Sequence, residues 1–466
     1  FWLKFERKHH HRNAARAPPH PKRRGAMSAA GFGVQVLHRA DARASPEDLD
    51  LPKGRYGFGV SWDTVRGRSV DIDLQCVVVD RGGAIVDCAY YNNLKAAGAI
   101  THSGDEAQGK PDNIEEMVWV NMRKVQQNVS LLVFVVAAYS GGNLQDVSNG
   151  RLHVLEEKQT NEIALFEMER SKASVDVVAA MFRTGPGGQD WKLRIIDVPA
   201  QAGQHFMDIL PLLSQVVRSF VPGAPQRQKV AFAMEKGAVL DLPMGMGEIT
   251  VGLGWDVDEG ECDLDVSAIL LDAEGLDLEA VFFGRLESEQ HGIEHTGDNL
   301  TGEGEGDDEQ INVRLDKIGP NVEQVVFVVN IYTQNKTFQQ VAEPFCRVVD
   351  AADGSELCRY ALRDAGRENG LIIAKIAREA GGRWGFHALG LPCRGRTYKD
   401  SLPKIRQTCH LKTSSLMLPE TATATWGTSS DPRLLGHPGV GEGKVATRVQ
   451  APLVQASDGQ KCCCVQ

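Results

Sequence analysis

The sequence predicts a mainly β protein: two tandem β-sandwich domains, each with one late α-helix, and unstructured segments at both ends. The chain has 466 residues, enough for two or three domains, and an ordinary composition with 42% apolar and 24% charged residues. It repeats itself at a nearly fixed spacing. Its apolar segments are short, rich in Val, Ile and Phe, and separated by Gly, Asp and Asn, as expected for strands joined by turns.

The repeat is visible in motifs that recur 193 positions apart. Trp62 and Trp255 each stand in a G-x-x-W-D motif. The same spacing separates HSGDE (from His102) and HTGDN (from His295), LLVFVV (131–136) and QVVFVV (324–329), and Trp191 and Trp384. Around Asp71 and Asp263 the spacing is briefly 192, which indicates one small insertion. We infer a tandem duplication and call the copies repeat 1 (residues 31–220) and repeat 2 (residues 228–391).

Repeat 2 shows the expected elements most clearly. The predicted strands are EITVGLGW (248–255), DVSAILLD (265–272), AVFFG (280–284), INVRLDKI (311–318) and VEQVVFVVNIY (322–332). A helix is predicted late in each repeat, over residues 368–382 and 173–188, because each segment closes on glycines suited to a helix C-terminus. The prevalence of strands favours a β-sandwich in each repeat.

Three other segments complete the domain organisation. Residues 1–30 are predicted to be unstructured or the result of a wrongly assigned start codon, because Met27 offers a start. Residues 221–227 are predicted to be a linker. Residues 392–466 are rich in Pro, Gly, Ser and Thr without hydrophobic periodicity, so this tail is predicted to be disordered.

Charge and cysteine usage narrow the function classes. The net charge is −10, although the first 24 residues carry eight Lys and Arg. The remainder of the chain is therefore strongly negative, which argues against nucleic acid as the partner, since phosphate binding needs a basic face. The first seven of ten cysteines form no C-x-x-C pair, which favours reduced thiols in a cytoplasmic protein. The apolar runs are too short for a transmembrane helix.

Two acidic stretches of repeat 2 form the candidate site. Residues 298–309 hold six carboxylates and three glycines, and residues 255–265 hold six more acids, with no Lys or Arg in either stretch. Ca²⁺ takes six to eight hard oxygens, which such stretches supply, although the EF-hand spacing is absent. Acidic Gly-rich loops are also commonly just solvated, and that interpretation stays open. The candidate calcium ligands are Asp263, Asp265, Asp298, Asn299, Thr301, Glu303, Asp307, Asp308 and Glu309.

The neighbouring residues are expected to have structural roles. Asp263 and Asp265 flank Leu264, so a strand would place both on the same side. His295 is expected to be a packed or capping residue, and Trp255 and Trp384 are expected to lie in cores. A zinc site at Cys262 is not expected, because Cys and His ligands at suitable spacing are absent.

The motifs VGLGWD, DLDVSAILLD, HTGDNLTGEGEGDDEQI and VVFVVNIY of repeat 2, and YYNNLK of repeat 1, resemble the TerD family of tellurite-resistance and stress proteins. The resemblance implies a calcium-binding β-sandwich without established catalytic activity. Carried over to repeat 1, it implies weaker candidate ligands at Asp71, Asp73, Asp105, Glu115 and Glu116. There, Lys110 replaces Glu303 and Ile114 replaces Asp307. We therefore expect repeat 1 to bind calcium weakly or not at all.

The chain ends in CCCVQ, which fits a C-terminal prenylation box. Cys463 would take the prenyl group and Cys462 a palmitoyl group, and a chance cysteine-rich tail is the alternative. Lipidation would make the protein a peripheral membrane protein on the cytosolic face.

The function expected from the sequence is that of a non-enzymatic calcium-binding stress-response protein, linked to resistance against tellurite or other toxic oxyanions. Its partners would be the calcium ion and an unidentified protein, and no catalytic or cofactor-binding residues are expected apart from the metal ligands. One alternative is a metal-dependent phosphoesterase in which Asp263, Asp265 and Asp307 hold a water-activating metal. Another is an interaction scaffold whose acidic loops are simply solvated.

Overall fold

The computed structural model describes most of both repeats. The described residues are 34–39, 47–64, 70–104, 114–140, 142–158, 161–200, 202–257, 262–297, 299, 306–362 and 366–409. The described residues of both repeats lie within one compact unit. The predicted unstructured N-terminus and the lipidation candidates Cys462 and Cys463 lie outside the described residues.

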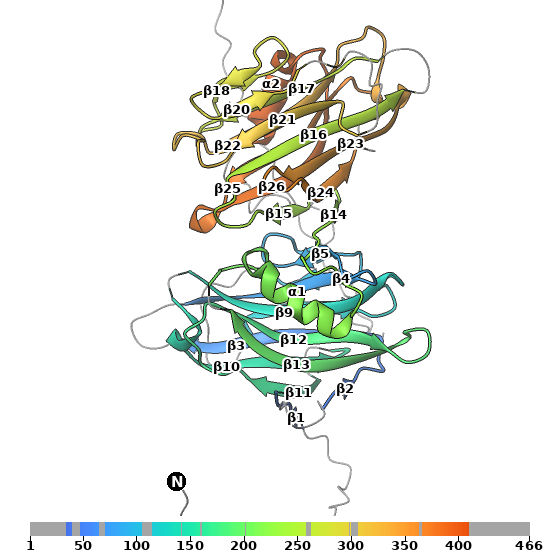
Figure 1. The fold of residues 1–466 in the computed structure, drawn as a ribbon, viewed down its shortest axis with the longest axis vertical. Coiled ribbons are helices and arrows are strands. Elements are labelled where there is room, and N and C mark those ends of the chain that lie inside the picture. The colour runs from blue at the N-terminus through green and yellow to red at the C-terminus, as the bar shows by residue number, and fades with distance from the viewer. Residues whose placement is uncertain are drawn as a thin grey trace, which may run out of the picture. The chain divides into compact units, whose positions relative to one another are not determined.

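Each repeat is a sandwich of a seven-stranded and a six-stranded sheet, as predicted (Figure 1). In repeat 1 the seven-stranded sheet runs in the order β1 (Gln35–Val36), β11 (Glu162–Glu167), β10 (Val147–Glu156), β3 (Arg55–Thr64), β8 (Glu116–Asn121), β7 (Ile100–His102) and β6 (Lys95–Ala96). The six-stranded sheet runs β2 (Leu49–Asp50), β13 (Asp190–Ala200), β12 (Val175–Thr184), β9 (Val129–Ser140), β4 (Asp71–Asp80) and β5 (Ile85–Ala89).

Repeat 2 has the same strand order in both sheets, which confirms the duplication. Its seven-stranded sheet runs β14 (Phe232–Met234), β24 (Ser355–Ala361), β23 (Val341–Asp350), β16 (Glu248–Val257), β21 (Glu309–Arg314), β20 (Ile293–His295) and β19 (Glu287–Ser288). Its six-stranded sheet runs β15 (Val239–Asp241), β26 (Trp384–Cys393), β25 (Gly370–Arg378), β22 (Gln324–Ile331), β17 (Leu264–Leu271) and β18 (Asp277–Val281).

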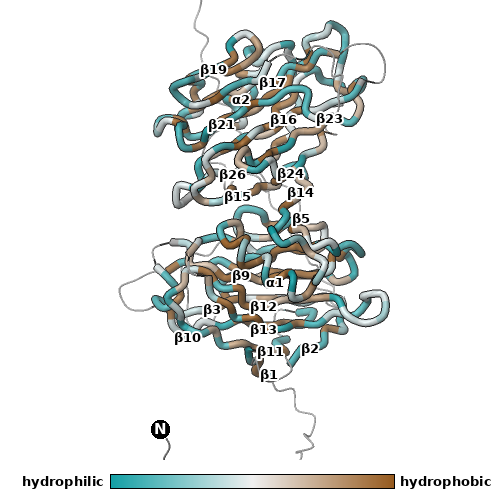
Figure 2. Tube along the Cα trace, in the orientation of Figure 1, coloured by the Kyte–Doolittle hydropathy of each residue, from teal (hydrophilic) through white to brown (hydrophobic). Residues whose placement is uncertain are grey.

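The central strands of the six-stranded sheets are buried on both faces. In β9, Leu132 and Phe134 belong to the core between the two sheets, whereas Leu131 and Val133 belong to a second core on the outer face. Such strands are apolar at consecutive positions instead of alternating. Figure 2 shows β9 and β12 as hydrophobic along much of their length.

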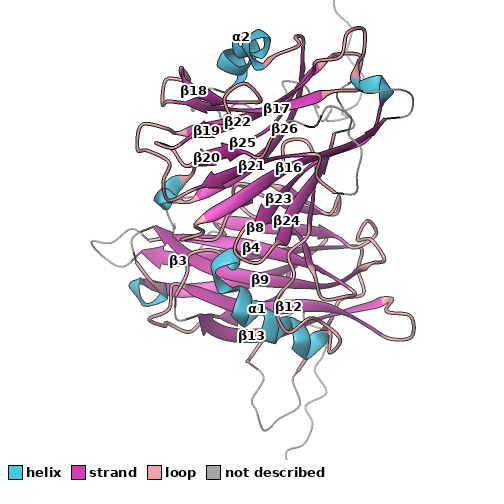
Figure 3. Ribbon diagram, turned by 45° about the horizontal axis from the view of Figure 1, so that its top comes forward, coloured by secondary structure: helices cyan, strands magenta, loops and turns pink. Residues whose placement is uncertain are grey.

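The two predicted helices are wrong, because residues 173–188 contain β12 and residues 368–382 contain β25. Both strands are central and covered on both faces, so their continuous apolar runs show no period-2 alternation. Runs of this kind cannot be distinguished from buried helices by periodicity. Each repeat does have a late α-helix, but further along the chain: α1 (Leu210–Phe220) and α2 (Tyr398–Thr408) (Figure 3).

Helix α2 lies in the segment predicted to be disordered, so repeat 2 extends to at least residue 409. Ile405 of α2 packs with Ile269 and Val328 on the outer face of the six-stranded sheet. Thr397 and Asp400 form a capping box that fixes the start of the helix. Helix α1 covers the corresponding face in repeat 1, where Leu213 and Val217 share a core with Val133.

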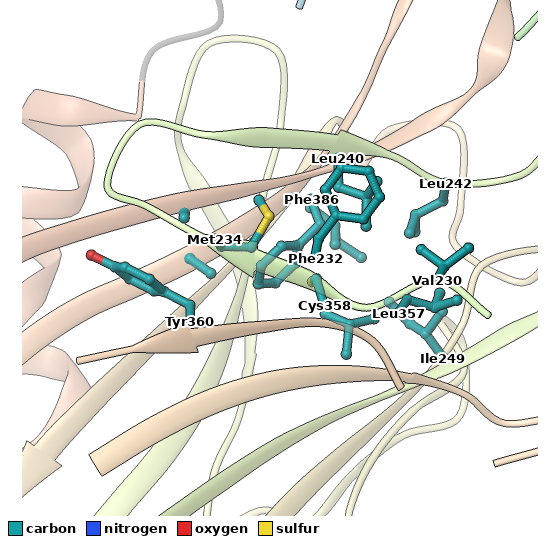
Figure 4. Packing of buried hydrophobic residues seen from close by; sticks show 14 of the residues in the cluster. Val230, Phe232, Met234, Leu240, Leu242, Ile249, Leu357, Cys358, Tyr360 and Phe386 are labelled. Carbon is teal, nitrogen blue, oxygen red and sulfur yellow. The ribbon is translucent and has the colours of Figure 1, made fainter. Parts of the chain in front are cut away.

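The segment after α1 is folded and leads directly into repeat 2. Arg218 and Ser214 of α1 donate hydrogen bonds to the carbonyl of Gln226. Ile85 of β5 then makes an isolated parallel bridge to Val230. Figure 4 shows the next residues, Phe232 of β14 and Leu240 of β15, packed with Phe386 of β26. The predicted linker, residues 221–227, is therefore a short ordered connection.

Polar contacts also join the two repeats. The Arg383 guanidinium donates to both carboxylate oxygens of Asp208, at 3.0 and 2.8 Å, and also to the carbonyl of Leu242 at 2.8 Å. The Asp241 carboxylate accepts hydrogen bonds from Tyr91 at 3.1 Å and from Asn92 at 3.0 Å. Asp241 is fully buried and Arg383 is only 2% exposed. Each of these buried groups is thus hydrogen-bonded by side chains of the other repeat, Arg383 by a carboxylate and Asp241 by a tyrosine and an asparagine.

The seven cysteines among the described residues are free and buried. Burial raises the pKa of the Cys76 and Cys346 thiols above the usual value, which keeps them protonated. No helix in the described part of the chain is long and apolar enough to span a membrane.

Candidate calcium site and family membership

The candidate ligands of repeat 2 come from three neighbouring segments: the start of β17, the loop before β21, and the start of β21. Asp263, Asp265, Asn299, Asp307, Asp308 and Glu309 lie among the described residues, whereas Asp298, Thr301 and Glu303 do not. In repeat 1, Asp71, Asp73, Glu115 and Glu116 are described and Asp105 is not.

Glu309 joins the two sheets of repeat 2. It is the first residue of β21, its side chain is wholly buried, and its Oε2 accepts a hydrogen bond from the Val266 amide of β17 at 2.7 Å. His295 Nε2 lies 3.7 Å from the same oxygen. Oε1 accepts from the Asn299 amide at 3.4 Å. Burial raises the pKa of Glu309, so a nearby positive charge would favour its ionised form.

Repeat 1 contains the same buried pair. Glu116 Oε2 accepts from the Leu74 amide at 2.6 Å, and His102 Nε2 lies 3.4 Å from it. The histidine Nδ1 atom accepts from the amide of Gly104 in repeat 1, and from the amide of Gly297 in repeat 2. The prediction that His295 is a packed or capping residue is therefore confirmed. Because the pair recurs in both repeats, we interpret Glu116 and Glu309 first as structural links between sheets.

Asp308 closes the acidic loop. Its Oδ2 accepts from the Trp255 backbone amide at 2.8 Å, and its Oδ1 accepts from the Asn299 side chain at 3.2 Å. The Trp255 indole donates to the carbonyl of Cys262 at 3.1 Å. Trp255 is 3% exposed, as expected for a core residue. These contacts place the end of the loop beside the segment that carries Asp263.

Asp265 lies next to this cluster but on the other face of its sheet. Leu264 and Val266 belong to the core between the sheets, so the alternation of β17 directs Asp265 to the face that α2 covers. Asp265 is 5% exposed. Asp263 directly precedes the strand, and its amide donates to the Thr333 hydroxyl at 2.9 Å. Hydrogen bonds thus connect Asp308, Asn299 and Glu309, and Glu309 connects to the residue after Asp265.

The described residues alone do not make a complete metal centre. Within the described ranges, no three His, Cys, Asp or Glu side chains are grouped closely enough to hold a metal ion. The oxygens that the cluster offers, from carboxylates and an amide, are of the hard type that Ca²⁺ prefers. The other predicted ligands of the loop fall outside the described residues.

Asp307 is directed elsewhere. Its carboxylate pairs with Arg347 of β23, with Nε–Oδ1 at 2.7 Å and Nη2–Oδ2 at 3.0 Å, and it also accepts from Gln310 at 2.9 Å. The side chain of Asp307 is 1% exposed. It lies over Gly252 of β16, where an added Cβ would stand 2.2 Å from Oδ2. Arg347 in turn contacts Glu356 at 3.2 Å.

Repeat 1 replaces both members of this ion pair. Ile114 lies over Gly59 as Asp307 lies over Gly252, and His153 occupies the register position of Arg347. His153 keeps a carboxylate partner in Glu162, at 2.7 Å, as Arg347 keeps Glu356. The loss of Asp307 in repeat 1 therefore accompanies the loss of its arginine. This paired change is the sequence signal that could have revealed the role of Arg347, which sequence reasoning missed.

Replacing Arg347 with Ala should lower the free energy of unfolding by roughly 1–3 kcal/mol, because it leaves a nearly buried carboxylate without its charged donor. Chemical denaturation of the full chain measures this. Arg285→Ala, which removes an exposed arginine paired with Glu279, is the matched control and should have little effect. Equal losses in the two variants would show that the Asp307 pair is not a structural contact.

Comparison with known proteins adds the family. The model of the TerD domain matches residues 50–207 and 230–402, more than half of the chain and one match in each repeat. The chain belongs to the TerD family. The second TerD match extends into α2, in agreement with the fold of residues 398–408.

The curated relatives are matched over about a third of this TerD-family chain and nearly all of their own length. Tellurium resistance protein TerZ of Serratia marcescens is 41% identical over 180 residues, 38% of this chain and 92% of the relative. Stress response protein SCP2 of Bacillus subtilis (strain 168) is 40% identical over 189 residues, 34% of this chain and 92% of the relative. Tellurium resistance protein TerD of Alcaligenes sp is 36% identical over 179 residues, 36% of this chain and 93% of the relative.

A crystal structure of a homologue of telluride resistance protein (TerD) from Streptomyces coelicolor A3(2) also matches. It is 24% identical, covers 33% of this chain and 95% of its own chain, and gives a TM-score of 0.30.

Proposed function

We propose that this TerD-family chain is a non-enzymatic, cytoplasmic calcium-binding protein of the stress response, and that repeat 2 holds the ion. The names of its relatives refer to tellurium resistance and to stress response. A role in resistance to tellurite or similar oxyanions is part of the proposal.

The observation that carries the proposal is the closure of the acidic loop by Asp308. This carboxylate binds the Trp255 amide with one oxygen and Asn299 with the other, so both ends of residues 299–308 are fixed beside Glu309. A cation would stabilise acidic groups brought together here, because ionised carboxylates about 5 Å apart repel by roughly 3 kcal/mol at an effective dielectric near 20.

The donor chemistry also suits calcium. Asp263, Asn299, Asp308 and Glu309 would supply the oxygens from the described residues, with Asp298, Thr301 and Glu303 as further ligands. When bound, the ion would supply positive charge that neutralises these groups. Asp265 is outside this proposed set, because β17 directs it to the other face of its sheet. Asp307 is also outside this proposed set, because the Arg347 guanidinium pairs with both of its oxygens and already neutralises its charge.

Thermal melting of the full chain tests the proposal. Millimolar Ca²⁺ should raise the melting temperature by several degrees over a sample with chelator, since a ligand that binds only the folded state stabilises it by mass action. Asp308→Asn should remove most of the rise. Asp316→Asn removes an exposed carboxylate in the turn after β21 and should preserve it. If the melting temperature of the wild type is the same with and without Ca²⁺, the proposal is wrong.

Membrane attachment through the C-terminal cysteines is a separate part of the proposal. Prenylation of Cys463, with palmitoylation of Cys462, would give the two lipid signals that stable anchoring needs. Protein expressed in a eukaryotic cell should then partition into the detergent phase, and Cys463→Ser should return it to the aqueous phase. A wild-type protein found wholly in the aqueous phase would show that the tail is not a lipid anchor.

A further inference from the structure

The two repeats contact each other through two different surfaces. We define the socket as Tyr90, Tyr91, Asn92 and Asp208 of repeat 1, and the plug as Asp241, Leu242 and Arg383 of repeat 2. Tyr90 Oη accepts from the Asp241 amide at 3.0 Å and donates to the Val239 carbonyl at 3.2 Å. With the Tyr91, Asn92 and Asp208 contacts, both charged side chains of the plug, Asp241 and Arg383, have hydrogen-bond partners in the socket.

Repeat 2 has the framework of a socket of its own. The turn at Phe282, which bridges to Arg285, corresponds to the turn at Tyr90, which bridges to Asn93. Phe283 packs against Tyr332 with ring centres 6.1 Å apart, as Tyr91 packs against Tyr139 at 5.3 Å. This second socket is open, since Phe283 is 39% and Tyr332 is 43% exposed.

The acidic residue of the socket, Asp208, also has a counterpart in repeat 2. Asp208 accepts from the Gln204 amide at the start of its helix, and Asp400 accepts from the Arg396 amide in the same way. The second socket therefore consists of Phe282, Phe283, Gly284 and Asp400. Compared with the socket of repeat 1, it keeps an acidic residue but lacks the two tyrosine hydroxyls and the asparagine side-chain amide.

Repeat 1 likewise has the framework of a plug. The Leu51 amide donates to the Trp191 carbonyl as the Leu242 amide donates to the Trp384 carbonyl. Asp50 thus corresponds to Asp241, and Asp190, which precedes Trp191, corresponds to Arg383. Asp50 has a 77% exposed side chain, and an open cleft of about 1120 Å³ lies among Asp50, Leu51, Asp190 and their neighbours.

We call the plug of repeat 1 (Asp50, Leu51 and Asp190) the free plug, and the second socket, in repeat 2, the free socket. If the free plug of one chain stacked on the free socket of another, the contact would bury groups that do not match. Asp50, which pairs with Lys192 at 3.2 Å, would meet Phe283 and Gly284 in place of the two donors that Tyr91 and Asn92 offer to Asp241. Asp190 would face Asp400, and these two carboxylates would repel each other. In the existing contact between the repeats, the corresponding residues Arg383 and Asp208 attract each other. Burying a carboxylate with fewer hydrogen-bond donors is unfavourable, and adjacent like charges add to the penalty.

We infer that the socket and plug are a directional pairing surface for TerD repeats, and that residues Phe282, Phe283, Gly284 and Asp190 prevent a second copy of this chain from stacking on the first. A plug-and-socket contact is heterologous, so matched free ends would extend into open-ended assemblies. The substitutions at the second socket and at the plug of repeat 1 limit the stacking to the two repeats of one chain. This inference is independent of calcium binding.

The test restores the match in the full chain. The variant Asp190→Arg/Phe282→Tyr/Phe283→Tyr returns the arginine and both hydroxyls, so its sedimentation coefficient should increase with concentration. The wild type should sediment as a single chain at every concentration. The control Asp190→Glu/Phe282→Tyr/Phe283→Tyr carries the same tyrosines with the repelling charge, and it should also stay single. Circular dichroism checks that each variant is folded.

A second arrangement avoids dependence on one triple variant. Asp190→Arg in one chain and Phe282→Tyr/Phe283→Tyr in another place the two matched surfaces on separate molecules, so mixing them should give a two-chain complex that neither forms alone. Association of the wild type, association of the Glu control, or absence of association in both matched arrangements would overturn the inference.

Discussion

Replacing Arg383 with Ala lowers the free energy of unfolding of the full chain by about 3–5 kcal/mol, which we expect to be the largest effect of a single substitution between the repeats. Arg383 is 2% exposed, and its guanidinium binds both oxygens of Asp208 and the Leu242 carbonyl. The hydrogen bonds from Arg383 lower the pKa of Asp208 although burial alone would raise it. Removing the arginine leaves this carboxylate charged and without its cationic partner.

Denaturant unfolding measures the loss, and the chain provides a matched control. Arg394 also binds a carboxylate through two nitrogens, that of Glu368, but its side chain is 85% exposed. Arg394→Ala should therefore change stability little, because water screens exposed ion pairs. If Arg383→Ala costs no more than Arg394→Ala, the buried pair does not hold the two repeats together.

Replacing Glu116 or Glu309 with Ala should have the second largest effect, a loss of about 2–4 kcal/mol in either repeat. Each wholly buried carboxylate accepts a hydrogen bond from a backbone amide of the opposite sheet, that of Leu74 or of Val266. Truncation leaves that amide unsatisfied and opens a small cavity beside the histidine.

Hydrogen exchange at the two amides tests this interpretation directly. Glu116→Ala should speed exchange at Leu74, and Glu309→Ala should speed exchange at Val266, each within its own repeat. Glu294→Ala removes an exposed acid from β20, beside β21, and should leave both amides protected. Unchanged protection at Val266 in Glu309→Ala would refute the structural role of this carboxylate.

Much of the architecture was predictable from the sequence, because the duplication shows the same pattern twice. Strands β16, β17 and β22 were predicted within a few residues, since Gly, Asp and Asn bound their apolar runs. The helix predictions failed at β12 and β25 because a strand buried on both faces lacks alternation. Helix α2 was missed for the opposite reason: only Ser401 and Ile405 of its residues are buried, so it shows little apolar periodicity.

The candidate site was predictable in composition but not in orientation. The acids of residues 298–309 suggested one shared ion, yet Asp307 and Glu309 are directed to different partners. Glu309 enters the core, whereas Asp307 lies over Gly252 and pairs with Arg347. Arg347 is 40 positions away in the chain, and only the antiparallel pairing of β16 with β21 and β23 brings the two together. Nothing in the sequence near Asp307 indicates this contact, and only the paired replacement of both residues in repeat 1 points to it.

The central claim, that repeat 2 binds calcium through the loop closed by Asp308, is tested most directly by isothermal titration of Ca²⁺ into the full chain. The wild type should bind, Asp308→Asn should weaken the affinity by about tenfold or more, and Glu115→Gln at the corresponding position of repeat 1 should leave it unchanged. Absence of binding heat in the wild type, or equal weakening by Glu115→Gln, would contradict the claim.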